Sequence, residues 1–291
     1  MATALARFID RLDAYEKLVR LDKPIGTLLL LWPTLWALWL SANGQPDWKV
    51  VWIFVLGTVL MRSSGCAMND YADRNFDAHV KRTMHRPLAA GRIKPREAVW
   101  VAVVLALVAF VLVLQLNALV IKLSFLALFV AFSYPFTKRF ISLPQAYLGV
   151  AFGFGIPMAY AAHLESVPAV AWGMLLANIF WAIAYDTAYA MADRDDDLRI
   201  GIKSSAILLG RFDVAGVMLS HAAFILILAA IGIAQRYHWG YFAGLLLAMI
   251  LIAAQYPMIR HRSREGCFKA FNFNNWVGGA VFLGCLAAHL E

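Results

Sequence analysis

Charged residues are scarce in this sequence: they make up 15% of its 291 positions, whereas 62% of the residues are hydrophobic. Soluble domains carry about 25% charged residues, which keep their surfaces solvated. The composition therefore excludes an ordinary soluble protein, and we expect the chain to be embedded in lipid.

Cysteine is also rare, and Cys66, Cys267 and Cys285 lie far apart with no CxxC spacing. This pattern excludes a disulfide framework and a cysteine-based zinc site. A cleavable signal peptide is not expected, because residues 1–23 mix acidic and basic side chains with short apolar patches. Such a segment is typical of an amphipathic helix at a membrane surface.

Long apolar runs dominate the rest of the chain. A helix that crosses a bilayer needs about 20 predominantly apolar residues, and nine runs come near this length. We predict an all-α polytopic membrane protein with nine transmembrane helices, forming one domain over residues 1–291. The runs are residues 24–40, 50–68, 98–116, 118–132, 147–162, 167–189, 214–234, 238–254 and 271–288.

Basic residues indicate how the protein is oriented. Most of the 26 Lys and Arg residues lie before the first run or in every second loop after it. Such loops face the cytoplasm, so the N-terminal segment 1–23 is expected there and the C-terminus on the opposite side. The same loops account for the net charge of +8, and we expect no nucleic-acid partner.

Two of the predicted cytoplasmic loops contain clustered aspartates. No proline precedes the last aspartate of either cluster, so each preceding helix is expected to continue through it. Spacings of four residues place like charges on one helical face, where they repel each other, and a divalent cation would remove this repulsion. The clusters comprise Asn69, Asp70, Asp73 and Asp77 in the first loop, and Asp193, Asp195 and Asp197 in the second, with Asp195 on the far face.

Magnesium binds one or two protein carboxylates and completes its octahedron with water and phosphate oxygens. The two clusters therefore predict two Mg²⁺ ions that hold a diphosphate, one ion on Asp73 and Asp77 and the other on Asp193 and Asp197. For either cluster alone, a solvated helix end is the alternative. Candidates for contact with the diphosphate oxygens are Arg74, Lys81, Arg82, Arg86, Lys203 and, less directly, Arg20; Lys81 and Arg82 equally suit solvated loop residues.

The motifs of these loops are specific. NDxxDRxxD spans Asn69 to Asp77 and is followed by Arg86-Pro87-Leu88, and DxxxD spans Asp193 to Asp197 with Lys203 downstream. With these motifs the chain resembles the UbiA superfamily of membrane prenyltransferases over nearly its whole length. Segments 22–27 and 185–191 are similar to the branch that acts on 4-hydroxybenzoate.

The resemblance implies a nine-helix bundle around one central cavity in a bacterial inner membrane. It also implies Mg²⁺-dependent transfer of a polyprenyl group from polyprenyl diphosphate to carbon 3 of 4-hydroxybenzoate, in ubiquinone biosynthesis. Membrane lipid and the two substrates are then the partners. Another acceptor, a naphthoate or haem, is the alternative within the superfamily, and a secondary transporter is the alternative outside it, although its acidic residues would be expected near the membrane midplane.

Further residues are assigned to the reacting groups. Asn69 and Asp70 are expected to support the metal-binding aspartates. The aromatic faces of Tyr134 and Tyr189 suit a developing carbocation. Arg139 offers a planar guanidinium for the acceptor's carboxylate, with anchoring of its own loop as the alternative.

Overall fold

The protein is described by a computed structural model that covers residues 2–75, 77–79, 83–137 and 139–290. Within these ranges the regular structure is entirely helical, as the sequence predicted. The elements are α1 (Ala2–Leu18), α2 (Ile25–Ser41), α3 (Trp48–Asp73), η1 (Asp77–His79), α4 (Pro95–Val113), α5 (Ala118–Thr137), α6 (Pro144–Gly153), α7 (Gly155–Leu164), α8 (Ala169–Ile200), α9 (Ser205–Leu209), η2 (Gly210–Phe212), α10 (Asp213–Ala234), α11 (Trp239–Ala253), α12 (Tyr256–Ile259) and α13 (Arg264–Leu286).

All nine predicted apolar runs fall in helical regions. Among the described residues, seven helical segments are long and apolar enough to cross a bilayer, and they include the joined pairs α6–α7, α9–α10 and α11–α12. The run 24–40 forms α2, which is apolar but has only 17 residues. The run 271–288 lies mostly in α13, whose several asparagines lower its hydropathy. The all-α class is confirmed, whereas the count of nine crossings is not.

Asn117 explains how two apolar runs are joined with almost no loop. Its side-chain oxygen accepts hydrogen bonds from the backbone N–H groups of Leu119 and Val120, both at 3.1 Å, and so caps the start of α5. Its amide nitrogen donates to the carbonyl of Ala161 on α7 at 2.7 Å. One side chain therefore caps the start of α5 and ties the turn to α7.

Small residues bring several helices into close contact, which is the usual way that helices associate where lipid replaces water. A Cβ atom at Gly149 on α6 would lie 2.6 Å from the Cα of Ile179 on α8. One at Gly244 on α11 would lie 2.4 Å from the Cα of Gly284 on α13. These glycines are needed because any side chain would force the helix backbones apart.

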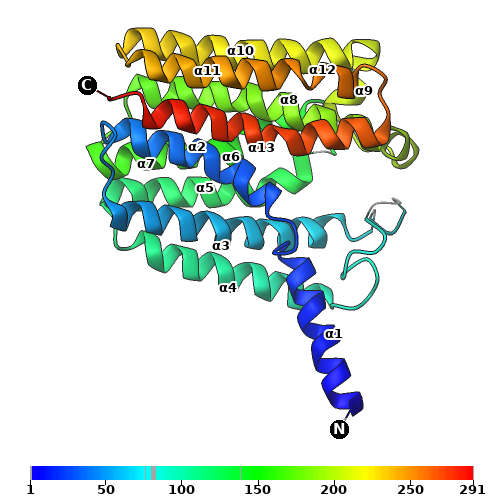
Figure 1. Ribbon diagram of the computed structural model, residues 1–291. Coiled ribbons are helices and arrows are strands. Elements are labelled where there is room, and N and C mark those ends of the chain that lie inside the picture. The colour runs from blue at the N-terminus through cyan, green and yellow to red at the C-terminus, as the bar shows by residue number, and fades with distance from the viewer. Residues whose placement is uncertain (1, 76, 80–82, 138, 291) are drawn as a thin grey trace.

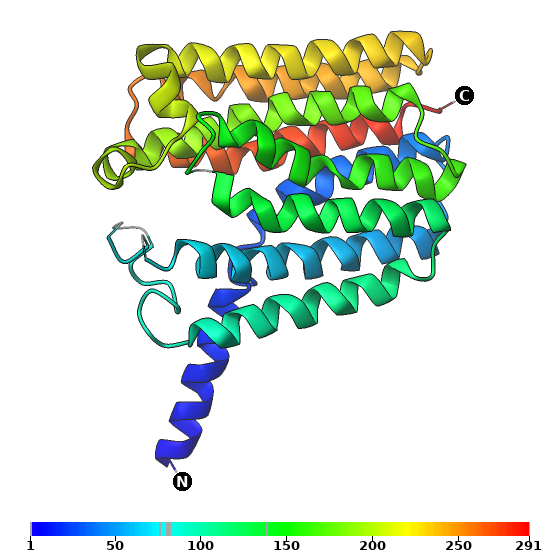
Figure 2. The same cartoon turned by 180° about the vertical axis from the view of Figure 1, so that it is seen from behind.

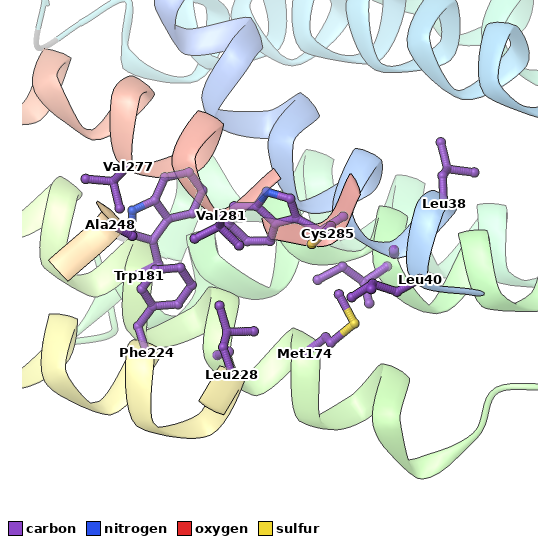
Figure 3. Packing of buried hydrophobic residues seen from close by; sticks show 14 of the residues in the cluster. Leu38, Leu40, Met174, Trp181, Phe224, Leu228, Ala248, Val277, Val281 and Cys285 are labelled. Carbon is purple, nitrogen blue, oxygen red and sulfur yellow. The ribbon is translucent and has the colours of Figure 1, made fainter. Parts of the chain in front are cut away.

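An aromatic core joins α2, α8 and α10. The rings of Trp181 and Phe224 are stacked with their centroids 5.7 Å apart, and Trp36 lies 5.1 Å from Trp181. Aliphatic residues of α11 and α13 complete this packing, as Figure 3 shows for Ala248 and Val277. Trp181 is fully buried, so its ring anchors α8 in this core.

Figures 1 and 2 show the long helices running side by side, with the C-terminus at one end of the bundle. Helices α3 and α8 finish at the other end, where α1 also leaves the bundle at a steep angle. Arg11 of α1 forms an ion pair with Glu97 at 2.8 Å, and Arg92 pairs with Asp13 at the same distance. The two aspartate clusters and the N-terminal helix are therefore gathered at one end.

Candidate active site

The first aspartate cluster is built by a helix end and a turn. Helix α3 ends at Asp73, and Asp77 begins the separate short helix η1. The prediction that one helix carries both residues is therefore wrong. Asp77 is instead held by two residues later in the chain. The Thr83 hydroxyl donates to its backbone carbonyl at 2.9 Å, and Arg86 donates to its carboxylate.

Arg86 is the centre of this cluster. Its Nη1 lies 2.8 Å from Oδ2 of Asp77 and 3.1 Å from Oδ1 of Asp70. Arg20 reaches the same Asp70 oxygen at 2.8 Å, and the amide of Asn69 donates to Asp73 at 3.2 Å. Residues that are 50 or more positions apart thus meet in one charged network.

Electrostatics in this network favour additional positive charge. Burial raises the pKa of the Asp77 carboxyl; Arg86 opposes the shift, and the carboxylate of Asp73 adds to it. Burial alone would lower the pKa of the Arg86 guanidinium, but the carboxylates of Asp70 and Asp77 outweigh it and hold that pKa above its ordinary value. Arg86 is a permanent cation, yet it does not fully compensate its carboxylate neighbours.

The second cluster is carried by an unbroken helix, as predicted. Helix α8 runs from Ala169 to Ile200 and ends at Gly201, which adopts a left-handed conformation with φ of 73°. Asp193 is buried and Asp195 is exposed, in agreement with the predicted opposite faces. Asp196, which the sequence reading passed over, is buried and pairs with Arg264 at 2.9 Å.

A large cavity of about 1180 Å³ lies at this end of the bundle and extends between α3, α4 and α5. Its walls are mostly apolar, with charged and polar side chains concentrated near the aspartate end. Of the residues predicted from the sequence, six line it: Arg20, Asn69, Asp70, Arg86, Tyr134 and Tyr189. Lys17, Lys23 and His85 are further polar residues of the lining.

The other predicted residues that the structure describes lie outside this lining, and these include the four predicted metal-binding residues Asp73, Asp77, Asp193 and Asp197. Arg74 donates to the carbonyl of Tyr71 at 2.7 Å and stacks over that ring. Arg139 donates to the carbonyl of Ala72 at 2.8 Å, so it contacts the end of α3. Lys203 donates to the carbonyl of Phe140 at 3.2 Å. Lys81 and Arg82 fall outside the described residues.

The UbiA prenyltransferase family matches residues 30–278 of this sequence. The chain belongs to that family. It is 62% identical to the 4-hydroxybenzoate octaprenyltransferase of Dechloromonas aromatica over 97% of this chain and 95% of that protein. It is 61% identical to the enzyme of the same name from Cupriavidus necator over 97% of this chain and 99% of that protein.

Solved structures of UbiA homologues share the fold. A homologue from Aeropyrum pernix superposes with a TM-score of 0.79 at 26% identity, covering 91% of this chain and 98% of that one. A homologue from Archaeoglobus fulgidus, solved with GPP and Mg²⁺ bound, has a TM-score of 0.68 at 16% identity, covering 92% of this chain and 99% of that one. At this identity the second likeness concerns the fold alone.

The donor atoms at the UbiA-type aspartate clusters suit a hard divalent cation. They are carboxylate and amide oxygens, the ligands that Mg²⁺ prefers. One of them, Oδ2 of Asp70, is buried with no hydrogen-bond partner among the described residues. No set of three or more His, Cys, Asp and Glu side chains in the described ranges is close enough to hold one ion. The residues therefore fit an ion whose coordination is completed by substrate and water.

Two cavity residues were missed by the sequence reading. Arg62 is located inside the apolar helix α3 and lines the cavity, and its Nε is buried without a hydrogen-bond partner in the described chain. Gly26 makes room for it, since a Cβ there would lie 2.6 Å from its Nη2. Tyr185 is the second, with a buried and equally unpartnered hydroxyl. A lone arginine within an apolar run was the signal that could have identified Arg62.

Proposed function

We propose that this chain transfers a polyprenyl group from polyprenyl diphosphate to carbon 3 of 4-hydroxybenzoate, a step of ubiquinone biosynthesis. Relatives with that name are about 60% identical over nearly the full chain. The observation that carries the proposal is the cavity, which is apolar along most of its length and has arginines and carboxylates at one end. This polarity matches a substrate with an isoprenoid tail and a diphosphate head.

The protein is placed in a bacterial inner membrane with nine crossings and the aspartate end in the cytoplasm. The coincidence of the nine apolar runs with helices supports the count, and the basic loops support the orientation. Helix α1 is assigned to the cytoplasmic interface. Its exposed side chains Leu5, Phe8, Ile9 and Leu12 recur at the spacing of one helical face.

Two Mg²⁺ ions are assigned to the aspartates, one to Asp73 and Asp77 and the other to Asp193 and Asp197. When bound, they would neutralise the diphosphate and make it a better leaving group. Arg20 and Arg86 are placed on the remaining diphosphate oxygens, since both line the cavity beside Asp70. Arg74, Lys81, Arg82 and Lys203 remain predicted contacts, and Asn69 and Asp70 orient the neighbouring groups.

The reaction assigned to the site is electrophilic aromatic substitution. The bond between the allylic carbon and the diphosphate oxygen breaks with its electron pair on the oxygen, and carbon 3 of the ring bonds to the allylic carbon before losing its proton. Tyr134 and Tyr189 line the cavity and present aromatic faces to the developing cation. The apolar walls exclude water, which would otherwise capture that cation.

The isoprenoid tail is assigned to the apolar part of the cavity. Side chains of α4 and α5, among them Leu107, Phe110 and Phe125, line this part. Leu107 and Phe125 are also more than half exposed (58% and 59%). A long tail therefore has an apolar path that remains in contact with lipid.

Two arginines compete for the acceptor's carboxylate. Arg139 was predicted from the sequence, but its guanidinium contacts the backbone of Ala72 and lies outside the cavity lining. Arg62 lines the cavity, and its unpartnered Nε supports the assignment of the carboxylate to this residue. The role of Arg139 as acceptor ligand stays a prediction, with support of the α3 end as its alternative.

The deciding experiment supplies membranes that contain this protein with radiolabelled polyprenyl diphosphate, Mg²⁺ and a panel of acceptors. A labelled product from 4-hydroxybenzoate, and none from a dihydroxynaphthoate or haem, is expected. Product from another acceptor alone would overturn the acceptor assignment. Movement of a solute across vesicles without any covalent product would favour the transporter alternative.

The two arginines are separated by matched variants, Arg62→Lys and Arg139→Lys. A lysine cannot reproduce the planar pair of donors, so the variant at the true site should raise the KM for 4-hydroxybenzoate by about one to three orders of magnitude. The KM for the diphosphate should hardly change. We expect this result for Arg62→Lys; the same result for Arg139→Lys instead would place the carboxylate near the end of α3.

A further inference from the structure

Tyr185 has the most unusual environment of any hydroxyl in the cavity. It is 1% exposed, it lines the cavity, and its Oη has no hydrogen-bond partner among the described residues. Leaving a buried hydroxyl unpaired is unfavourable, because it loses its hydrogen bonds to water and gains none in return. A buried donor in the wall of a cavity, with no partner among the described residues, indicates that a bound ligand supplies the partner.

Arg62 provides a second unpaired donor in the same cavity. Its Nε is buried and unpartnered within the described part of the chain. Arg62 and Tyr185 both line the cavity, together with Tyr134 and Asp186. An N–H and an O–H with nothing to bond to match a carboxylate, which has two oxygens and only accepts hydrogen bonds.

Depth in the membrane agrees with this pairing. Arg62 lies seven positions before Asn69 on α3, and Tyr185 lies eight positions before Asp193 on α8. At about 1.5 Å per helical residue, both are about 10 to 12 Å deeper than the aspartate clusters. An acceptor whose carboxylate reaches this depth places its ring between the two donors and the diphosphate end.

The position of Tyr185 is fixed by a buried polar network behind it. The Tyr185 ring packs edge-on against Trp181, with centroids 5.2 Å apart. The Trp181 Nε1–H donates to Oδ1 of Asn274 at 3.0 Å, and Nε2 of His221 lies 2.9 Å from the same oxygen. An amide oxygen only accepts, so Nε2 of His221 donates here in the tautomer that is protonated on Nε2, while Nδ1 lies 3.2 Å from the carbonyl oxygen of Val217.

The network also spans several helices. The Asn274 amide nitrogen donates to Oε1 of Gln255 at 2.8 Å and to the carbonyl of Ala270 at 3.0 Å. Asn274 and His221 are both fully buried. Residues of α8, α10 and α13, together with Gln255 between α11 and α12, therefore fix the orientation of the Trp181 ring.

We propose that Tyr185 donates a hydrogen bond to the carboxylate of the aromatic acceptor beside Arg62, and that Trp181 is a positioning residue held by Asn274 and His221. The proposal rests on the proposed function. It makes Tyr185 a specificity-determining residue. An aromatic substrate without a carboxylate would leave two buried donors unpaired, and sites of this kind reject such analogues strongly.

The principal test is Tyr185→Phe, which removes only the hydroxyl. The KM for 4-hydroxybenzoate should rise about tenfold, as for the loss of one buried hydrogen bond, while the KM for the polyprenyl diphosphate stays unchanged. Tyr160→Phe is the matched control, because that buried hydroxyl bonds to the sulfur of Met174 instead. An unchanged acceptor KM in Tyr185→Phe, or an equal rise in Tyr160→Phe, would overturn the proposal.

Competitive inhibitors identify the group that Tyr185 binds. Benzoate has the carboxylate and lacks the ring hydroxyl, whereas phenol has the reverse. In Tyr185→Phe, the inhibition constant of benzoate should rise by the same factor as the acceptor KM, and that of phenol should not. The opposite pattern would assign Tyr185 to the ring hydroxyl. Failure of the wild-type protein to prenylate 4-hydroxybenzoate would instead contradict the proposed function. The assay of the wild-type protein therefore distinguishes that failure from a failure of the Tyr185 proposal.

The positioning role is tested with Trp181→Phe, which keeps an aromatic ring and removes the indole N–H. It should raise the acceptor KM less than Tyr185→Phe does, without changing the donor KM. The double variant should be no worse than Tyr185→Phe alone, because Trp181 acts through that hydroxyl. Additive effects of the two substitutions would show that Trp181 is only a packing residue.

Discussion

The two aspartate clusters differ in what holds their carboxylates in place. In the second cluster, one continuous helix carries Asp193 and Asp197, so the spacing along α8 sets their positions. In the first, the helix ends at Asp73, and Asp77 is held by Arg86. The backbone of the second cluster is therefore set by one continuous helix, whereas the turn of the first is held by ion pairs between separate parts of the chain.

This difference suggests that the two clusters respond differently when substrate binds. Arg86 now pairs with Asp70 and Asp77, and it also lines the cavity where the diphosphate is proposed to bind. Metal on the carboxylates would release Arg86 for phosphate oxygens. The first cluster is therefore expected to rearrange when substrate binds, while the second serves as a fixed support.

Removing divalent cations should have the largest effect. Excess chelator should abolish prenyl transfer, because diphosphate and carboxylates would then face each other unshielded. Hydrogen exchange sharpens the comparison: adding Mg²⁺ with an unreactive diphosphate should protect peptides of the first cluster more than those of the second. Full activity in chelator would contradict the metal assignment, and equal protection would contradict the different responses of the two clusters.

Removing single carboxylates comes next. Asp73→Asn and Asp193→Asn should each lower kcat by about two to three orders of magnitude, as for the loss of a group that stabilises transition-state charge. The folded protein should still insert into membranes. Asp195→Asn is the control, because Asp195 is exposed on another face of α8; a comparable loss there would show that the helical face is assigned wrongly.

Ion-pair variants compare the clusters directly. Arg86→Met leaves Asp70 and Asp77 buried without their shared partner, which costs about 3 to 5 kcal/mol for a buried pair. Arg264→Met removes a half-exposed partner of the buried Asp196 and should cost less than Arg86→Met, because solvent screens the more exposed guanidinium. Thermal unfolding measures both. Mg²⁺ should restore part of the stability of Arg86→Met only, and equal losses would contradict the contrast between the clusters.

Sequence reading predicted what depends on local pattern. Apolar runs located the helices, and the spacing on α8 placed Asp193 and Asp195 on different faces, as observed. The continuous helix expected through Asp77 was wrong. Nothing in the local sequence opposes that helix; the turn is stabilised by Thr83 and Arg86, whose contacts depend on the folded loop.

The cavity residues illustrate a second limit. Arg20 and Asp70 are 50 positions apart, and no periodicity predicts that they pair. Tyr185 was indistinguishable from other aromatic residues of α8 until its unpartnered hydroxyl was seen against the cavity. Arg139 was chosen because it is a lone arginine near Tyr134, yet the interior arginine of α3 is the one that lines the cavity.

The smallest expected effect concerns the glycines that follow the clusters. Gly91 and Gly201 have φ of 71° and 73°, and in both cases a Cβ would meet nothing within 4 Å. An alanine at either position therefore costs only backbone strain, about 1 kcal/mol. Asparagine tolerates this conformation better and should cost less.

Activity should nevertheless separate Gly91→Ala from Gly201→Ala. Gly91 closes the turn that follows Arg86, and its N–H donates to the carbonyl of Leu88 at 3.2 Å. Backbone strain at Gly91 would shift the loop that carries Arg86, and the first cluster depends on the geometry of this loop. Gly91→Ala should therefore also raise the KM for the diphosphate. Gly201→Ala strains only the end of a long helix and should leave that KM unchanged. If both variants lose donor affinity equally, the end of α8 is as adaptable as the first cluster, and the second cluster cannot be the fixed support.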